Sequence, residues 1–394
     1  MDALTTPLPK GWKKVRLGDI LELLTDYHAN GSYEILKNNV TLLKNVDFAI
    51  MIRTTNFENN DFKNDLIYID KKAYEFLSKS KVFAGDILVN KIANAGTAYF
   101  MPKLNQPVSL GMNLFLLRIK PSYNNLFIFK QIANYERVLK TFANGSATKT
   151  ITKNVIKNLL IPLPPLNEQI AIANILSDVD RYLYSLDALI LKKESVKKAL
   201  SFELLSQRKR LKGFNQAWQK VRLGDILSYE QPTKFLVATT QYLQKGFTPI
   251  LTAGKTFILG YTNDKHGIYT NIPVIIFDDF TTDSKMVNFP FKVKSSAIKI
   301  LSLRDNNQAD LKYIYEKLTL LKHQVTDHKR YWIDEFSNIE ILLPPLNEQI
   351  AIANILSGLD SEIISLKNKK RQFENIKKAL NHDLMSTKIR VLNK

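Results

Sequence analysis

The chain has 394 residues, no cysteine and a formal net charge of +19 at pH 7. Its hydrophobic content of 45% is ordinary for a globular protein, so the composition excludes a disordered chain and leaves room for two domains with cores. The lack of cysteine excludes disulfides and thiolate chemistry and fits a reducing compartment. The excess of basic residues predicts a polyanionic partner, most often a nucleic acid, although a genome bias toward lysine would produce part of it.

The first feature along the chain is the motif W-x-K-V-R-L-G-D-I, which begins at Trp12 and returns at Trp218. Residues 14–21 and 220–227 are identical. In the region that follows the first copy, short apolar runs predict strands and helical spacing predicts helices. The predicted strands are 65–69, 86–90, 114–119 and 159–162, and the predicted helices are 71–80 and 126–144.

The fifteen letters LPPLNEQIAIANILS occupy residues 163–177 and recur without change at residues 343–357. The proline pair ends the strand before it, and Asn167 is a plausible N-cap. Apolar residues then recur at spacings of three and four, which is typical of a coiled coil. The sequence therefore predicts a helix of about 44 residues from Glu168 to the residue before Gly213, and a second helix that ends near Val391.

The second globular region, about residues 218–342, is predicted to contain strands at 274–277, 289–293 and 298–303 and a helix at 310–322. Strands and helices do not alternate regularly in either region, so each is expected to be an α+β domain. The first long helix ends where the second region begins, and the second helix begins where that region ends. A compact second region therefore predicts antiparallel helices that pair along their apolar seams.

Two alternatives remain open at this stage. The long helices could each pack on their own domain instead of on each other. The identical letters could reflect a recent duplication without functional content, rather than a common partner that is bound twice while two diverged domains bind two different ligands.

The doubled LPPLNEQIAIANIL and W-x-K-V-R-L-G-D-I motifs resemble the specificity subunits of Type I restriction-modification systems, over essentially the whole chain. Residues 52–61, 80–96, 277–293 and 323–345 also resemble the recognition domains of that family. The resemblance implies an α+β tandem repeat with two target-recognition domains (1–165 and 213–345), a central helix (166–212) and a C-terminal helix (346–394) that form an antiparallel coiled coil. It further implies that each domain reads one half of a bipartite site on double-stranded DNA. The same resemblance implies that the helices set the spacing and dock two modification (methyltransferase) subunits, and that restriction subunits join that core.

Contacts to phosphates and base edges need basic, amide or hydroxyl side chains on loops. The candidates for DNA binding are Arg53, Thr54, Thr55, Lys91, Asn94, Ser146, Thr148 and Lys149 in the first domain, and Lys255, Tyr261, Thr281, Thr282, Lys285, His328, Lys329 and Arg330 in the second. The candidates for partner binding are Pro164, Pro165, Asn167, Glu168, Gln169, Pro344, Pro345, Asn347, Glu348 and Gln349. Any single candidate is more often a solvated surface residue, so the set is more informative than its members.

No catalytic constellation stands out. The Gly254-Lys255-Thr256 stretch has Pro249 where a nucleotide-binding loop needs glycine, and the five histidines show no metal-ligand spacing. We therefore expect a non-catalytic, cytoplasmic chain without a cofactor, a metal or a membrane segment. The alternatives are a scaffold that binds nucleic acid without sequence preference and a metal-dependent nuclease that uses Asp278 and Asp279.

Overall fold

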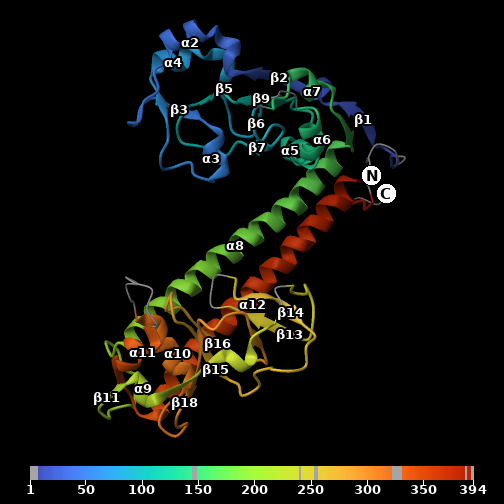
Figure 1. Ribbon diagram of the computed structural model, residues 1–394. Coiled ribbons are helices and arrows are strands. Elements are labelled where there is room, and N and C mark those ends of the chain that lie inside the picture. Colours follow the sequence, from blue (N-terminus) through green and yellow to red (C-terminus); the bar gives the residue numbers. More distant parts are fainter. Residues whose placement is uncertain are drawn as a thin grey trace. The chain divides into compact units, whose positions relative to one another are not determined.

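The computed structural model describes residues 8–143, 149–238, 241–252, 256–321, 331–386 and 388–391 (Figure 1). The chain forms two compact units. Unit 1 contains residues 1–185 and 370–394, and unit 2 contains residues 186–369. The two longest helices, α8 (Leu166–Leu205) and α12 (Leu346–Met385), each contribute a segment to both units.

The globular part of unit 1 contains, in chain order, β1 (Lys13–Arg16), α1 (Leu17–Ile20), β2 (Leu21–Asp26), η1 (Tyr27–Asn30), α2 (Tyr33–Asn39), β3 (Ala49–Ile52), α3 (Thr54–Glu58), β4 (Tyr68–Ile69), α4 (Lys71–Phe76), η2 (Ser78–Ser80), β5 (Lys81–Val82), β6 (Ile87–Asn90), β7 (Ala98–Phe100), β8 (Val108–Leu110), β9 (Leu114–Ile119), α5 (Asn125–Asn134), α6 (Glu136–Thr141), α7 (Lys153–Asn158) and β10 (Leu160–Leu163). Two four-stranded sheets have the orders β2-β9-β6-β7 and β4-β3-β8-β5. The pair β3–β8 is parallel, whereas the other pairs in these sheets are antiparallel.

The globular part of unit 2 contains β11 (Gln219–Arg222), α9 (Leu223–Ile226), β12 (Leu227–Glu230), η3 (Pro232–Phe235), β13 (Thr248–Leu251), β14 (Ile258–Thr262), β15 (Val274–Asp278), β16 (Ser284–Val287), β17 (Lys292–Val293), β18 (Ile298–Leu303), α10 (Leu311–Leu320), α11 (Tyr331–Asp334), η4 (Phe336–Asn338) and β19 (Glu340–Leu343). Its sheets have the orders β12-β18-β15-β16, β14-β13-β17 and β11-β19, and β13–β17 is again parallel. Both units are therefore mixed helix and sheet, as predicted.

The strand predictions for 114–119 and 298–303 match β9 and β18 to the residue, because both runs are buried and end at clear polar residues. The predicted strand 65–69 shortens to β4, since Asp65 has a left-handed backbone with φ of 46°. The predicted strand 289–293 shortens to β17, because Pro290 has no N–H for a ladder. The predicted helix 126–144 is interrupted at Tyr135, where α5 ends and α6 begins.

Both long helices end earlier than predicted. Helix α8 stops at Leu205 and α12 at Met385, rather than near residues 212 and 391. Gln207 takes a left-handed conformation with φ of 62°, which turns the chain out of the helix. At the other end, α8 begins at Leu166, so Asn167 lies inside the first turn and is not the N-cap that the sequence suggested.

The long helices contact each other inside each unit, and the contacts run in opposite chain directions. In unit 1, Asp180 of α8 pairs with Lys377 of α12 at 2.5 Å, and the ring centroids of Tyr182 and Phe373 lie 4.5 Å apart. In unit 2, the ion pair between Lys193 and Glu362 measures 2.5 Å. In unit 1 the partner numbers on α12 fall as the numbers on α8 rise, so the two segments run in opposite directions there, as predicted. A coiled coil along the full length of both helices stays a prediction.

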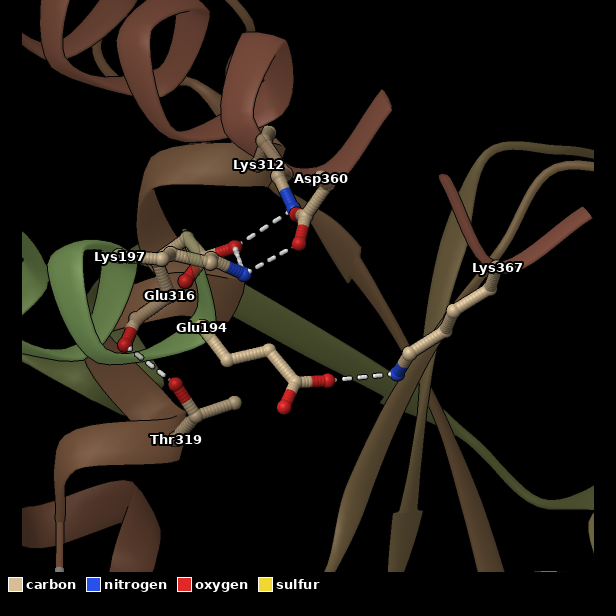
Figure 2. A network of polar contacts seen from close by, with 7 residues as sticks. All are labelled: Glu194, Lys197, Lys312, Glu316, Thr319, Asp360 and Lys367. Carbon is tan, nitrogen blue, oxygen red and sulfur yellow. Dashed lines mark hydrogen bonds and ion pairs between the residues drawn. The ribbon is translucent and has the colours of Figure 1, made fainter. Parts of the chain in front are cut away.

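A cluster of ion pairs joins the long helices of unit 2 to its globular part (Figure 2). Asp360 of α12 accepts from Lys197 of α8 at 2.6 Å and from Lys312 of α10 at 2.9 Å. Glu316 of α10 accepts from the same two lysines. Burial raises the pKa of Asp360, but the bonds from both lysines outweigh burial and hold the pKa below its ordinary value.

Unit 1 repeats the central part of this cluster. Asp180 accepts from Lys377 of α12 and from Lys130 of α5, the latter at 2.8 Å. In both units, therefore, one aspartate is bound by a lysine from the other long helix and by a lysine from the globular part. We call each three-residue arrangement an aspartate junction.

Among the described helices, none combines the length and hydropathy that a membrane crossing needs.

Candidate nucleic-acid interface

In unit 1, two segments leave the same edge of a sheet because β3 and β8 are parallel neighbours, and the first of them enters α3 at Thr54 instead of continuing as a loop. Residues 53–55 follow β3, and residues 111–113 connect β8 to β9. The backbone N–H of Gly111 donates to the carbonyl of Ile52 at 2.8 Å. A Cβ on Gly111 would lie 2.5 Å from that carbonyl oxygen, so only glycine permits this approach.

We call residues 111–113 the connector of unit 1. The hairpin loop between β6 and β7 lies on the other side of this connector. Its first residue, Lys91, donates its backbone N–H to the carbonyl of Asn113 at 2.8 Å. The backbone N–H of Ile151 donates in turn to the carbonyl of Lys91 at 3.1 Å. We call these three backbone bonds, Gly111 to Ile52, Lys91 to Asn113 and Ile151 to Lys91, the loop frame of unit 1.

The loop frame brings together the predicted DNA-binding residues of this unit that the structure describes. They are Arg53, Thr54 and Thr55 after β3, Lys91 and Asn94 in the hairpin loop, and Lys149 beside the β-bridge between Thr150 and Ile92. The Asn94 side chain also donates to Glu58 at the end of α3, at 3.4 Å. Ser146 and Thr148 lie outside the described residues.

Two of these basic side chains are half-buried and bond to other groups of the protein. The Arg53 guanidinium donates to the carbonyl of Asp65 at 3.0 Å. The Lys91 ammonium pairs with Asp26 at 2.9 Å, and Lys153 binds the other oxygen of that carboxylate at 3.0 Å. Burial raises the pKa of Asp26, but the bonds from the two lysines hold it below its ordinary value. Lys91 and Arg53 therefore orient the loops.

Unit 2 repeats the loop frame with different residues. The backbone N–H of Lys294 donates to the carbonyl of Leu251 at 3.0 Å, and that of Asp279 donates to Ala297 at 2.9 Å. The third bond runs from Tyr331 to the carbonyl of Asp279 at 3.2 Å. Residues 294–297 thus take the place of the connector 111–113, between β17 and β18.

Thr281 and Thr282 form the tight turn between β15 and β16, which corresponds to the β6–β7 hairpin loop of unit 1. Asp278 organises the turn by accepting from the backbone of Phe280 at 2.8 Å and of Thr281 at 3.3 Å. Thr282 is left-handed, with φ of 59°. Lys285 follows on β16, next to the turn.

The remaining candidates of unit 2 do not join the frame in the same way. Tyr261 lies on β14, which pairs with the edge of β13 opposite to β17. Lys255, His328, Lys329 and Arg330 lie outside the described residues. In the sequence, Arg330 directly precedes Tyr331, whose backbone N–H makes the third bond of the frame.

The ion pair next to the frame has the opposite sign at one equivalent position of the two units, and its partner comes from a different strand, since Asp26 ends β2 whereas Lys299 lies on β18. Asp279, at the position of Lys91, pairs with Lys299 of β18 at 3.3 Å. The Asp279 and Lys299 side chains are at most 2% exposed, and Asp279 also accepts from the backbone of Trp332 at 2.9 Å. Asp279 thus has partners in the protein, as does Asp278 in the turn.

The structure gives an internal role to part of the identical motif. Glu168 and Glu348 are buried, and each accepts a hydrogen bond from the indole N–H of its own unit, Trp12 at 3.2 Å or Trp218 at 3.1 Å. Each carboxylate also accepts hydrogen bonds from an arginine in the segment that follows the end of a long helix. Arg390 binds Glu168 at 2.8 Å, and Arg210 binds Glu348 at 2.6 Å.

The buried glutamines make the second repeated contact. Gln169 accepts from the backbone of Asn124, the N-cap of α5, and donates to the carbonyl of Pro164. Gln349 accepts from the backbone of Asp310, the N-cap of α10, and donates to Pro344. Internal bonds therefore account for the repeated Glu-Gln pair, which periodicity could not reveal. The residues of the motif with exposed side chains are Pro165, Leu166, Asn167, Ile170 and Asn174 in unit 1 and Asn347, Ile350, Asn354 and Ile355 in unit 2, while Pro345 is half-buried.

The family model for the Type I restriction modification DNA specificity domain matches this chain twice, at residues 9–193 and 215–375. The chain belongs to this family. The two matched segments each include a W-x-K-V-R-L-G-D-I motif, a loop frame and the start of a long helix.

Individual relatives in this specificity-domain family agree with the match. The EcoR124I/EcoR124II specificity subunit of a type I restriction enzyme from Escherichia coli is 46% identical over 172 residues, which are 42% of this chain and 41% of that one. A relative from Methanocaldococcus jannaschii, assigned as the MjaX specificity subunit of a type I restriction enzyme, is 29% identical over an alignment of 420 residues and 97% of each chain. The crystal structure of the S subunit of a Type I restriction-modification system from M. genitalium has the same fold, with a TM-score of 0.64, 18% identity and coverage of 97% of this chain and 98% of that one.

Neither connector, residues 111–113 or residues 294–297, is among the candidates that the sequence patterns indicate. The signal was present in unit 2, where the run KSSA stands between two predicted strands and offers a lysine and two hydroxyl groups. In unit 1 the run GMN gave no comparable signal, because its position at the sheet edge depends on the parallel pairing of β3 with β8, in which Ile50 pairs with Val108.

Proposed function

We propose that this chain is the DNA-specificity subunit of a Type I restriction-modification complex. Each unit reads one half of a bipartite sequence on double-stranded DNA, with the loop frame facing the duplex. The proposal is supported by the two family matches and by the net charge of +19, which favours a polyanionic ligand.

The observation that carries the proposal is the repetition of one loop frame with different side chains around it. Both frames place loops rich in basic, amide and hydroxyl groups at the ends of parallel strands. A common backbone with different side chains suits two readers of the same kind of ligand that recognise different sequences.

We further propose that residues 1–165 and 213–345 act as recognition domains and that residues 166–212 and 346–394 form a coiled coil. This coiled coil sets the spacing between the half-sites. Two modification subunits dock near the two identical helix starts, where Asn167 and Asn347 are exposed, and restriction subunits join the complex. In this arrangement the chain is non-catalytic and cytoplasmic, and the partner subunits supply methylation and cleavage.

The test is to map DNA methylation across the genome with the gene present and with it deleted. The expected result is the loss of one bipartite methylated motif on deletion. A methylome that does not change, in a host that expresses the modification subunit, contradicts the proposal.

Binding experiments separate the alternatives. A complex of the chain with its modification subunits is expected to shift duplexes that carry the motif at much lower concentration than random duplexes of equal length. Equal affinity for both kinds of duplex would favour the non-specific scaffold. Metal-dependent cleavage by the isolated chain would favour the nuclease.

A further inference from the structure

We infer that the two connectors of the loop frames are the central reading elements, and that Asn113 and Lys294 each specify a base in one half-site. This inference rests on the proposed function and assigns its specificity to side chains that the sequence patterns did not single out.

Each connector is fixed at both ends by backbone bonds. In unit 1 the frame ties Gly111 to the end of β3 and Asn113 to the hairpin loop. In unit 2 it ties Lys294 to the end of β13 and Ala297 to the turn after β15. A connector that is held on both sides loses little conformational freedom on binding, which favours precise placement of its side chains.

The connectors also expose their polar groups. Asn113 and Lys294 are exposed, and neither side chain forms a hydrogen bond or an ion pair with the residues that the structure describes. By contrast, the Arg53 guanidinium on one side of the unit 1 connector donates to the backbone carbonyl of Asp65, and the Lys91 ammonium on the other side pairs with the Asp26 carboxylate. The flanking basic residues therefore position the loops, whereas the connector side chains are available to a ligand.

The chemistry of the available groups differs between the units. The Asn113 amide has the donor and acceptor that pair with N7 and N6 of adenine in the major groove. Next to it, Met112 is 51% exposed and offers an apolar surface to a thymine methyl group. The Lys294 ammonium has only donors, which suit O6 and N7 of guanine. We therefore expect an adenine contact in the half-site that unit 1 reads and a guanine contact in the half-site that unit 2 reads.

The experiment selects bound sequences from a library of duplexes with random bases, using the complete complex with its modification subunits. The wild-type complex defines the motif. Asn113→Ala is expected to reduce discrimination about 10- to 100-fold at one position of one half-site, and Lys294→Ala to do so at one position of the other half-site. The matched controls are Asn38→Ala and Lys265→Ala, which change exposed residues of the same type outside the frames and are expected to leave the motif unchanged.

Conservative variants separate base reading from folding. Asn113→Asp keeps the shape and removes the amide donor, so it is expected to lose the adenine preference even if the alanine variant fails to fold. Lys294→Arg keeps a donor for guanine and is expected to retain the wild-type preference.

The outcomes are distinct. A wild-type complex that selects no motif contradicts the proposed function. A wild-type motif that the Asn113 and Lys294 variants reproduce without change contradicts only the connector assignment. If a variant loses affinity equally for all sequences, the connector assignment is also contradicted, because that pattern indicates contacts to phosphates.

Discussion

Unit 1 and unit 2 bind the starts of their long helices with the same side chains, yet the ion pair next to their loop frames has the opposite sign at one equivalent position. Glu168 and Glu348 each bind a tryptophan and an arginine. Next to the loop frames, however, the lysine Lys91 of unit 1 is replaced by the aspartate Asp279 of unit 2. The helix starts repeat a set of side-chain bonds, so the residues stay the same. The frames repeat only backbone bonds, so the side chains, and even the sign of their charge, are free to change.

The largest expected effect is on stability at the helix starts. Glu348→Ala leaves the Trp218 indole and Arg210 without their acceptor, and Glu168→Ala does the same in unit 1. We expect each variant to lose about 3–5 kcal/mol of unfolding free energy in denaturant titrations. The control, Glu194→Ala, removes a surface pair with Lys367 and is expected to cost less than about 1 kcal/mol. If the Glu168 and Glu348 variants lose clearly different amounts of unfolding free energy, the two helix starts are not equivalent.

The inverted ion pairs are expected to differ in cost. Lys299→Met leaves the buried Asp279 carboxylate without its cation, whereas Lys91→Met leaves Asp26 with Lys153. We expect a loss of about 2–4 kcal/mol for Lys299→Met and about 1 kcal/mol for Lys91→Met, measured by thermal unfolding. If Lys91→Met costs as much as Lys299→Met, the second lysine of unit 1 does not compensate.

The aspartate junctions predict a dependence of stability on pH. Asp360 and Asp180 have pKa values below the ordinary 3.8 in the folded protein, so their pairs stabilise the fold above that pH. This contribution is lost as the pH falls through the lowered pKa, because protonation removes the charge. The difference in Tm between the wild type and Asp360→Asn is therefore expected to be present at pH 7 and to shrink below pH 4. A difference that is independent of pH would show that charge is not involved.

The smallest expected effect on stability lies at the exposed part of the identical motif. Ile170 and Ile350 are 41% and 42% exposed, so Ile170→Glu and Ile350→Glu are expected to shift the unfolding free energy by less than about 0.5 kcal/mol. Each is expected to remove one docked modification subunit, since a charge then faces an apolar contact. Light scattering on the purified complex measures the mass. An unchanged mass for both variants would place the docking surface elsewhere.

Sequence patterns predicted the features that depend on local spacing. The tandem repeat, the two long helices, their antiparallel direction and the buried strand 114–119 follow from periodicity and from the order of the motifs. The helix ends did not follow, because a left-handed residue such as Gln207 stops α8 without a proline or glycine.

The candidate site was predictable in part. Arg53, Lys91 and Thr281 were singled out by residue type, and the structure places them at or beside the loop frames. Residue type could not show that Lys91 is bound to Asp26 or that Glu168 is buried, because both facts depend on partners more than 60 residues away in the sequence.

The contact of Arg390 with Glu168 and with the carbonyl of Lys10 has a consequence for biosynthesis. Unit 2 is one continuous stretch of chain, whereas unit 1 needs Leu384 and Met385 in its core. During synthesis on the ribosome, the last residue of unit 2 is therefore made before the last helical segment of unit 1. A polypeptide that is released just before residue 370 would contain every residue of unit 2 but would lack the last segment of unit 1.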